Sequence, residues 1–231
     1  MGNIAEEGIM KQGLFITFEG LEGCGKSTQV KKLFQSLKKR NIPILITKEP
    51  GGTKIGDKIR KILLDKKNNG MDYKAEMLLF LASRSENVRL NIIPALEEGK
   101  IVISDRFFDS TTAYQGYGRG IDIDTIRQLN HLVVEEAIPD LTIILDIEPG
   151  IGLKRSASFS DESEMRFEEE FIEKKIIHGK LFLDRVKDGY HKIAKNNSNR
   201  IKVIDANRSE DEIFEDVIRI VNKKISERLN L

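Results

Sequence analysis

The stretch that decides the fold is Gly20-Leu21-Glu22-Gly23-Cys24-Gly25-Lys26-Ser27. It fits the pattern G-x-x-x-x-G-K-[ST], with an apolar run over Leu14–Phe18 before it and a helical pattern from Thr28 after it. A glycine-rich loop between a strand and a helix presents consecutive backbone N–H groups to phosphate oxygens, and the helix adds the positive end of its dipole. The pattern therefore predicts a nucleotide phosphate site over Gly20–Thr28.

Two side chains of the loop carry chemistry of their own, and a third is a cysteine. We expect Lys26 to place its charge at the β- and γ-phosphates of a nucleotide and the Ser27 hydroxyl to ligate Mg²⁺. The alternative is a glycine-rich turn that binds nothing, which the flanking strand and helix disfavour. Cys24, the single cysteine, is interpreted as a small residue that fills a tight turn. The alternative is a reactive thiol whose pKa is lowered by the helix N-terminus.

Five short apolar runs alternate with helical patterns along the chain. The runs are Leu14–Phe18, Ile44–Thr47, Ile101–Ser104, Leu141–Asp146 and Ile201–Asp205. The main helical patterns are Thr28–Lys39, Lys74–Glu98, Asp124–Glu136, Glu168–Ala194 and Glu210–Leu229. Buried strands that alternate with helices are typical of a parallel sheet with right-handed crossovers. We expect one three-layer α/β domain over residues 14–231, with the P-loop NTPase fold, a five-stranded parallel sheet flanked by helices, and ligands at the carboxyl ends of the strands.

Composition limits the function classes. The 231 residues include 38 Lys and Arg against 37 Asp and Glu, and a net charge of +1 disfavours a general nucleic-acid binder. One cysteine excludes an intramolecular disulfide, and no apolar run has the length that crosses a membrane. Residues 1–13 lack the basic and apolar regions of a signal peptide, so we expect a flexible extension there and a cytoplasmic protein.

A second anion-binding element follows the third apolar run. Asp105 and Arg106 come where that strand is expected to end, so Asp105 is placed to hold Mg²⁺ through water and Arg106 to bind a phosphate. Phe80 and Arg84 are four residues apart and share a helix face that offers an aromatic plane beside a cation. Arg60 lies in an earlier helix. The alternatives are an ordinary ion pair between Asp105 and Arg106, and a core position for Phe80.

Four stretches together resemble the bacterial thymidylate kinase family. They are Phe18–Thr28, Lys48–Thr53 (KEPGGT, where the family usually has REPGGT), Leu78–Arg84 (LLFLASR) and Asp105–Gly116 (DRFFDSTTAYQG). The resemblance covers about Leu14 to Leu229. It implies an enzyme that transfers the γ-phosphoryl group of ATP to dTMP, yields dTDP and ADP, requires Mg²⁺ and forms a homodimer.

The resemblance also implies roles for individual residues. Phe80 would stack on the thymine, Arg60 and Arg106 would hold the acceptor phosphate, and Glu22 would approach the deoxyribose 3′-hydroxyl. The Glu49–Pro50 junction would be cis. The residues implied for dTMP are Glu22, Glu49, Pro50, Arg60, Phe80, Arg84, Arg106, Ser110, Thr111, Tyr114 and Gln115. Those implied for catalysis are Lys26, Asp105, Arg106 and Arg155, and those for the metal are Ser27 and Asp105.

The transferring phosphoryl group needs a further cation. In the family it comes either from an arginine of the phosphate loop or from a mobile, arginine-rich lid after the fourth strand. Positions 21–24 of this loop hold no arginine, so the resemblance implies a lid, over about 154–166. Between Arg155 and Arg166 that segment has no basic residue and instead carries Asp161, Glu162 and Glu164. We expect Arg155, then Arg166, to act in transfer; the alternative is two solvated charges at helix ends.

Two other functions stay open at this point. A kinase for another nucleoside monophosphate would lack the segment Thr111–Gly116, and a P-loop regulatory switch would bind nucleotide and signal through a partner. The guanine-reading motif N-K-x-D is absent, because Asn222–Ile225 lacks the final Asp. Apolar stripes on Lys74–Glu98 and Asp124–Glu136 have the length of a helix-packed dimer interface, although they could equally face the protein's own sheet.

Overall fold

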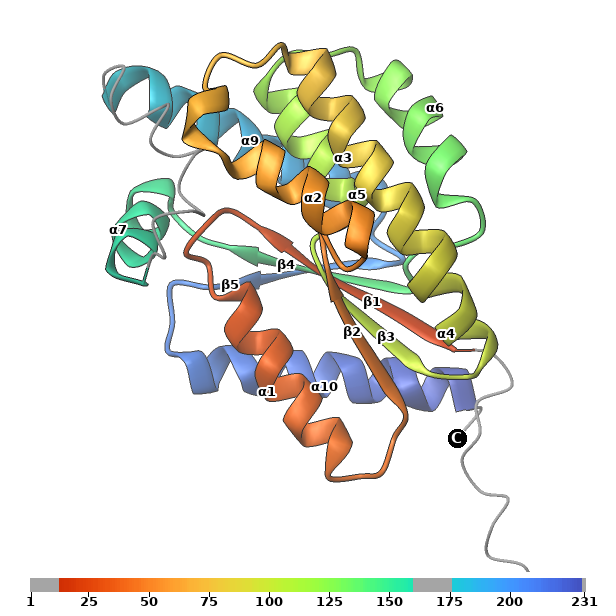
Figure 1. Ribbon diagram of the computed structural model, residues 1–231. Helices are drawn as coiled ribbons and strands as arrows, with labels where there is room; N and C mark the ends of the chain where they lie inside the picture. The colour runs from red at the N-terminus through yellow and green to blue at the C-terminus, as the bar shows by residue number, and fades with distance from the viewer. Residues whose placement is uncertain (1–12, 160–175, 230–231) are drawn as a thin grey trace, which may run out of the picture.

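A five-stranded parallel sheet forms the middle layer of the computed structural model, which describes residues 13–159 and 176–229 (Figure 1). Its strands are β1 (Leu14–Gly20), β2 (Ile44–Lys48), β3 (Ile101–Asp105), β4 (Leu141–Asp146) and β5 (Ile201–Asp205), in the spatial order β2-β3-β1-β4-β5. β1, β3 and β4 are buried along almost their whole length, which explains their continuous apolar runs. The phosphate loop leaves the central strand at its carboxyl end, where parallel sheets bind ligands.

Helices cover both faces of this sheet (Figure 1). On one face lie α1 (Lys26–Lys38) and α10 (Glu210–Leu229). On the other lie α2 (Lys54–Leu64), α3 (Tyr73–Asn87), α4 (Ile93–Glu97), α5 (Phe108–Thr111), α6 (Ile123–Val134) and α9 (Ile176–Asn196). The predicted three-layer α/β fold with a five-stranded parallel sheet is confirmed.

The predicted helix over Lys74–Glu98 is present but is not uniform. It consists of α3, a π-helical turn over Val88–Ile92 (η2), and α4. Pro94 has no N–H and its ring crowds the carbonyl four residues earlier, so the wider π-turn lets the helix continue past it. A second π-helical segment, Thr112–Gly118 (η3), extends α5, and a short 3₁₀ turn, Lys66–Asn68 (η1), follows α2.

The segment after β4 holds a helix that the sequence patterns did not predict. Residues 154–159, the first part of the expected lid, belong to this helix, α7 (Pro149–Phe159). Pro149 suits the first position of a helix, and Leu153 packs against the main core. The rest of the expected lid, residues 160–166 with Arg166 at its end, and most of the N-terminal extension lie outside the described residues. In the described ranges, no helix is long and apolar enough to span a membrane.

Candidate active site

The loop between β1 and α1 leaves the first N–H groups of α1 without a side-chain cap. Gly25 is the N-cap residue with a φ of 94°, and no described side chain accepts a hydrogen bond there. Gly23 has a φ of 69°, and a Cβ atom on it would lie 2.0 Å from the carbonyl oxygen of Gly152. Uncapped N–H groups at a helix N-terminus attract anions. The loop has the backbone geometry that a phosphate group requires.

Partners from the loop and from β3 hold the side chains of Lys26 and Ser27. Lys26 Nζ donates to the carbonyl oxygens of Gly20 at 3.2 Å and Leu21 at 2.9 Å. Ser27 Oγ donates to Asp105 Oδ2 at 2.6 Å. A hydroxyl beside a carboxylate supplies the hard oxygen ligands that Mg²⁺ prefers.

Cys24 lies inside the loop and is buried. Burial raises the pKa of its thiol above the usual value, although Lys26 and Arg106 act in the opposite direction. The interpretation of Cys24 as a small residue that fills a tight turn fits this environment. The alternative of a thiol with a lowered pKa is wrong.

Arg106 follows β3 with a φ of 71° and points back to the phosphate loop. Its guanidinium pairs with Glu22, and its Nη1 donates to the Gly20 carbonyl at 3.0 Å and to Ser110 Oγ at 3.1 Å. Desolvation raises the pKa of Glu22, but Arg106 and Lys26 outweigh it and lower that pKa to about 2. Asp105 accepts from Ser27 instead, so the alternative of an ordinary Asp105–Arg106 ion pair is wrong.

A buried carboxylate, Glu19, supports the turn that carries Arg106. It accepts hydrogen bonds from the Phe107 N–H at 2.8 Å, from the Ser110 hydroxyl, and from Tyr190 Oη at 2.9 Å. Burial, with the negative charge of Asp109 nearby, raises the pKa of Glu19 to about 7. Glu19 thus links β1, α5 and α9 directly beneath Arg106.

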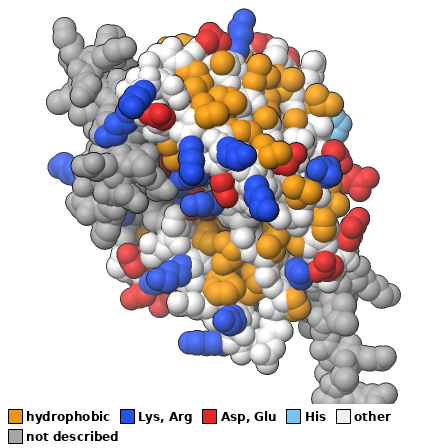
Figure 2. Space-filling view, in the orientation of Figure 1, with side chains coloured by type: hydrophobic (Ala, Val, Ile, Leu, Met, Phe, Trp, Pro, Cys, Tyr) orange, Lys and Arg blue, Asp and Glu red, His pale blue; other side chains and the backbone are white. Residues whose placement is uncertain are grey.

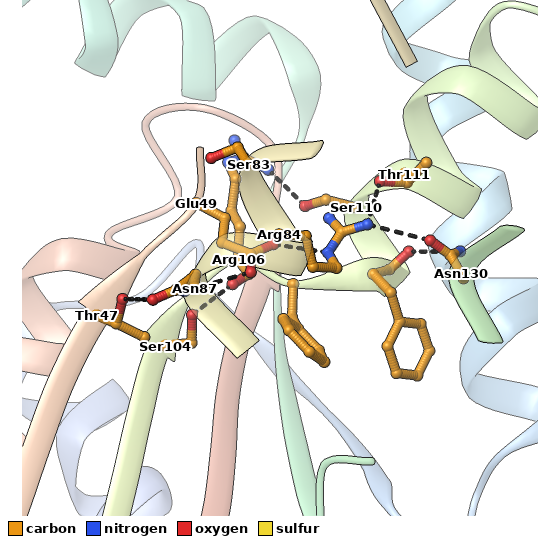
Figure 3. Close-up of polar contacts among 12 residues, drawn as sticks. Thr47, Glu49, Ser83, Arg84, Asn87, Ser104, Arg106, Ser110, Thr111 and Asn130 are labelled. Atoms are coloured by element: carbon orange, nitrogen blue, oxygen red, sulfur yellow. Dashed lines mark hydrogen bonds and ion pairs between the residues drawn. The ribbon is translucent and has the colours of Figure 1, made fainter. Parts of the chain in front are cut away.

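The side chain of Arg84, 1% exposed, crosses between α3 and α5 (Figure 3). Its Nε donates to Glu49 Oε2 at 2.7 Å, and its Nη1 donates to Thr111 Oγ1 at 3.0 Å and to Asn130 Oδ1 at 3.1 Å. Burial raises the pKa of Glu49, and Arg84 opposes that rise. The Glu49–Pro50 bond is cis, as the resemblance implied.

One cavity of about 640 Å³ joins these parts. Every described residue of the predicted site lines it except Gly20 and Leu21, which form the buried start of the loop. Phe80 is half-buried at this cavity and belongs to none of the described core clusters, so the core alternative for it is wrong. Arg155 also lines the cavity, and its Nη1 donates to the Ala206 carbonyl at 3.0 Å.

The comparisons with known proteins agree with one another. The family model for thymidylate kinase matches residues 18–217. A thymidylate kinase from Clostridium novyi is 44% identical over 90% of this chain and 98% of its own length, and one from Halothermothrix orenii is 46% identical over 89% and 95%. The crystal structure of thymidylate kinase from Ehrlichia chaffeensis superposes with a TM-score of 0.71 at 37% identity, covering 91% of this chain and 99% of that one.

The chain belongs to the thymidylate kinase family. Its family motifs fall on the elements that surround the cavity: the phosphate loop on β1 and α1, KEPGGT at the end of β2, LLFLASR on α3, and DRFFDSTTAYQG from β3 into η3. Arg166 lies outside the described residues, so the geometry bears only on Arg155 among the lid candidates.

Sequence reasoning missed several polar residues of this thymidylate kinase family site. The buried ones are Glu19, Glu76, Asn87, Asn130 and Tyr190. For Glu76 a signal existed, because Glu76, Phe80 and Arg84 recur every four residues and therefore share one face of α3. For Asn130 and Tyr190 there was none, since only the tertiary fold brings α6 against Arg84 and α9 against Glu19.

Proposed function

We propose that this chain transfers the γ-phosphoryl group of ATP to the 5′-phosphate of dTMP, with dTDP and ADP as products. The observation that carries this proposal is a single cavity with two different ends. One end is the uncapped N-terminus of α1 with Lys26, and the other is the Phe80–Arg84 face of α3. Arg106 lies where the two ends meet.

ATP would occupy the end formed by the phosphate loop. The N–H groups of Gly25 and the first turn of α1 would bind the β-phosphate, and Lys26 would exchange its two loop carbonyls for phosphate oxygens. Ser27 and Asp105 fit Mg²⁺, since their adjacent oxygens supply hard ligands and phosphates complete the set. When bound, Mg²⁺ neutralises charge on the β- and γ-phosphates.

dTMP would occupy the opposite end. Phe80 offers a plane for the thymine, and Arg84, Ser110, Thr111, Tyr114 and Gln115 lie around it. Arg60 and Arg106 offer cations for the acceptor phosphate, and Arg60 Nη1 already reaches the Pro50 carbonyl at 3.0 Å. Glu22, paired with Arg106, would face the 3′-hydroxyl of the sugar.

The chemistry that these residues supply is alignment and charge neutralisation. Two phosphate groups held in one enclosed cavity react as if at high effective concentration, and fixed cations stabilise the transferring group more strongly than water does. Arg155 lies on α7 at the ATP end and is our first candidate for the additional cation, with Arg166 second. The acceptor oxygen needs no strong base, because dTMP is already a phosphate anion.

We also propose a homodimer in the cytoplasm. Figure 2 shows hydrophobic side chains gathered on the upper part of the face that α2, α3 and α6 form. The exposed large residues on these helices are Ile55, Ile62, Tyr73, Leu78 and Leu132. Apolar helix faces of this kind support pairing of two copies. A single buried free cysteine suits a reducing compartment.

A panel of nucleoside monophosphates with ATP and Mg²⁺, followed by ADP production, tests the proposed function. We expect rapid turnover with dTMP and negligible ATP turnover without an acceptor. A preference for AMP, CMP or GMP would assign the chain to another monophosphate kinase. ATP binding with no acceptor-dependent turnover would favour a regulatory switch.

A further inference from the structure

A buried carboxylate, Glu76, lies behind Gln115 at the acceptor end of the cavity. Glu76 is on α3, and its side chain is 2% exposed. It accepts hydrogen bonds from Gln115 Nε2 at 3.0 Å and from Arg119 Nη2 at 3.4 Å. The Arg119 guanidinium carbon in turn lies 4.4 Å from the ring centre of Tyr73 and 5.1 Å from that of Phe182. Glu76 is therefore held in place by groups that are themselves packed.

This contact fixes the orientation of the Gln115 amide. An ionised carboxylate only accepts hydrogen bonds, so the NH₂ of Gln115 must face Glu76 and Oε1 must face away from it. Gln115 is 4% exposed and lines the cavity. Within the described ranges, no group donates a hydrogen bond to Oε1. A nearly buried acceptor without a protein partner at a cavity wall indicates a donor on the ligand.

Arg84, on α3, offers hydrogen-bond donors to the cavity, whereas Gln115 offers the acceptor Oε1. Arg84 Nε and Nη1 bind Glu49, Thr111 and Asn130, whereas Nη2 donates to none of the described residues. Arg84 donates to Thr111, and Gln115 follows Thr111 by four residues. Arg84 and Gln115 therefore line the same part of the cavity. A donor beside an acceptor matches a base edge that carries a 4-oxo group and N3–H. Cytosine reverses both, because it has an exocyclic NH₂ and an unprotonated N3.

We propose that Glu76 is a positioning residue that makes the acceptor end selective for 4-oxo pyrimidines. It holds the NH₂ of Gln115, so that Oε1 stays turned toward N3–H of the base. This inference rests on the proposed function, since it takes dTMP as the acceptor. Glu76 touches no reacting atom, and its effect on specificity is exerted through Gln115.

The isosteric substitution Glu76→Gln tests the inference. A glutamine both donates and accepts, so Gln115 becomes able to turn its NH₂ toward the cavity. We expect kcat/KM for dTMP to fall about tenfold and the preference for dTMP over dCMP to fall at least tenfold. Arg84 still opposes the cytosine NH₂, so some preference persists. The preference for dTMP over dUMP should stay unchanged, because both bases carry N3–H. Equal loss of both preferences, or of neither, would overturn the inference.

A double-mutant cycle separates positioning from general loosening. Gln115→Met removes the amide at similar volume and should itself lower the dTMP preference over dCMP. If Glu76 acts through Gln115, the double variant Glu76→Gln/Gln115→Met should show the same preference for dTMP over dCMP as the single variant Gln115→Met. A further drop of tenfold would contradict the proposed route.

A measurement on the unmodified chain covers the case in which Glu76→Gln does not fold. In the ligand-free protein, the side-chain NH₂ of Gln115, identified by its loss in Gln115→Met, should exchange with solvent far more slowly than an exposed glutamine. Exchange at the exposed rate would overturn the inference. Absence of dTMP turnover in the unmodified chain would instead refute the proposed function, so the two failures are distinguishable.

Discussion

The two ends of the cavity hold their cations in different ways. At the phosphate loop, Lys26 is held by the neutral carbonyls of Gly20 and Leu21, and the first N–H groups of α1 have no side-chain cap among the described residues. At the opposite end, Arg84 and Arg119 are buried in ion pairs with Glu49 and Glu76. The charge of Lys26 is available to an anion at the first end, whereas the charges of Arg84 and Arg119 at the second end are already neutralised.

This difference separates binding of a charge from recognition of a neutral ring. An incoming polyphosphate replaces weak carbonyl contacts at the loop and gains the full attraction of Lys26 and the helix dipole. A base meets fixed donors and acceptors whose directions, rather than whose charges, decide the fit. Removing one partner of a buried ion pair also leaves the other partner as an uncompensated buried charge, which destabilises the fold. Substitutions at the loop should therefore affect turnover, and substitutions at the far end should affect folding as well.

The largest effect is expected at the phosphate loop, from Lys26→Met. Loss of a fixed cation at the transferring group should lower kcat about 10³-fold, as measured by coupled ADP production. The free energy of unfolding should fall only by about 1 kcal/mol, since hydrogen bonds to loop carbonyls are lost. Lys31→Met, an exposed lysine of the same helix, is the matched control and should leave both values unchanged. A fall of less than tenfold would remove Lys26 from the transfer step.

Glu49→Gln tests the other side of the comparison. The substitution keeps the shape but leaves the buried Arg84 guanidinium without its counter-charge, so the free energy of unfolding should fall by about 3 kcal/mol. Urea denaturation measures this change. Glu98→Gln, which removes an exposed partner of Lys100, should cost less than about 1 kcal/mol. Equal losses in the two variants would show that burial of the Arg84 pair has no special consequence.

The sequence predicted the phosphate-loop end better than the acceptor end, for a physical reason. The loop is a contiguous motif whose glycines, Lys26 and Ser27 act through local backbone geometry. The acceptor end depends on Glu76 and Asn130, which come from two separate helices and reach Gln115 and Arg84 only once the chain has folded. β1, β3 and β4 were predictable because their apolar runs report burial on both faces. The edge strands β2 and β5 are partly exposed, and their short runs rich in Ile and Val were enough to predict them. The helix α7 was missed because Pro149, Gly150 and Gly152 in its first turn give no helical pattern in the sequence.

The pH dependence of stability sharpens the comparison at Glu19, which lies between the two ends. Its pKa is about 7 in the folded chain and near 4.5 when unfolded, so the folded state holds more protons between these values. By linkage, the free energy of unfolding should decrease as pH rises from about 4.5 to about 7, by up to about 3 kcal/mol from this carboxyl. Asp109 faces Glu19 and adds to the penalty of ionising it, whereas Arg106 and the hydrogen bonds from Ser110 and the Phe107 N–H reduce that penalty.

Glu19→Gln should therefore flatten the stability profile between pH 5 and pH 8, as measured by urea denaturation at each pH. Glu22→Gln is the matched control, because a pKa near 2 leaves that carboxylate ionised throughout this range. Its removal should not alter the slope. A Glu19→Gln profile parallel to that of the unmodified chain would contradict the assignment of a buried, protonatable Glu19.

The smallest predicted effect concerns the contact between the phosphate loop and α7. A Cβ atom on Gly152 would lie 2.5 Å from the carbonyl oxygen of Glu22, whereas one on Gly150, in the same helix, would meet nothing within 4 Å. Both substitutions to alanine raise helix propensity, so they differ mainly in whether the new methyl group displaces the loop. Gly152→Ala should raise KM for ATP about tenfold, or 1.4 kcal/mol, and leave KM for dTMP nearly unchanged. Gly150→Ala should alter neither constant. An unchanged KM for ATP in Gly152→Ala would mean that the loop yields without loss, and an equal rise in both constants would mean that the two ends of the cavity are not independent.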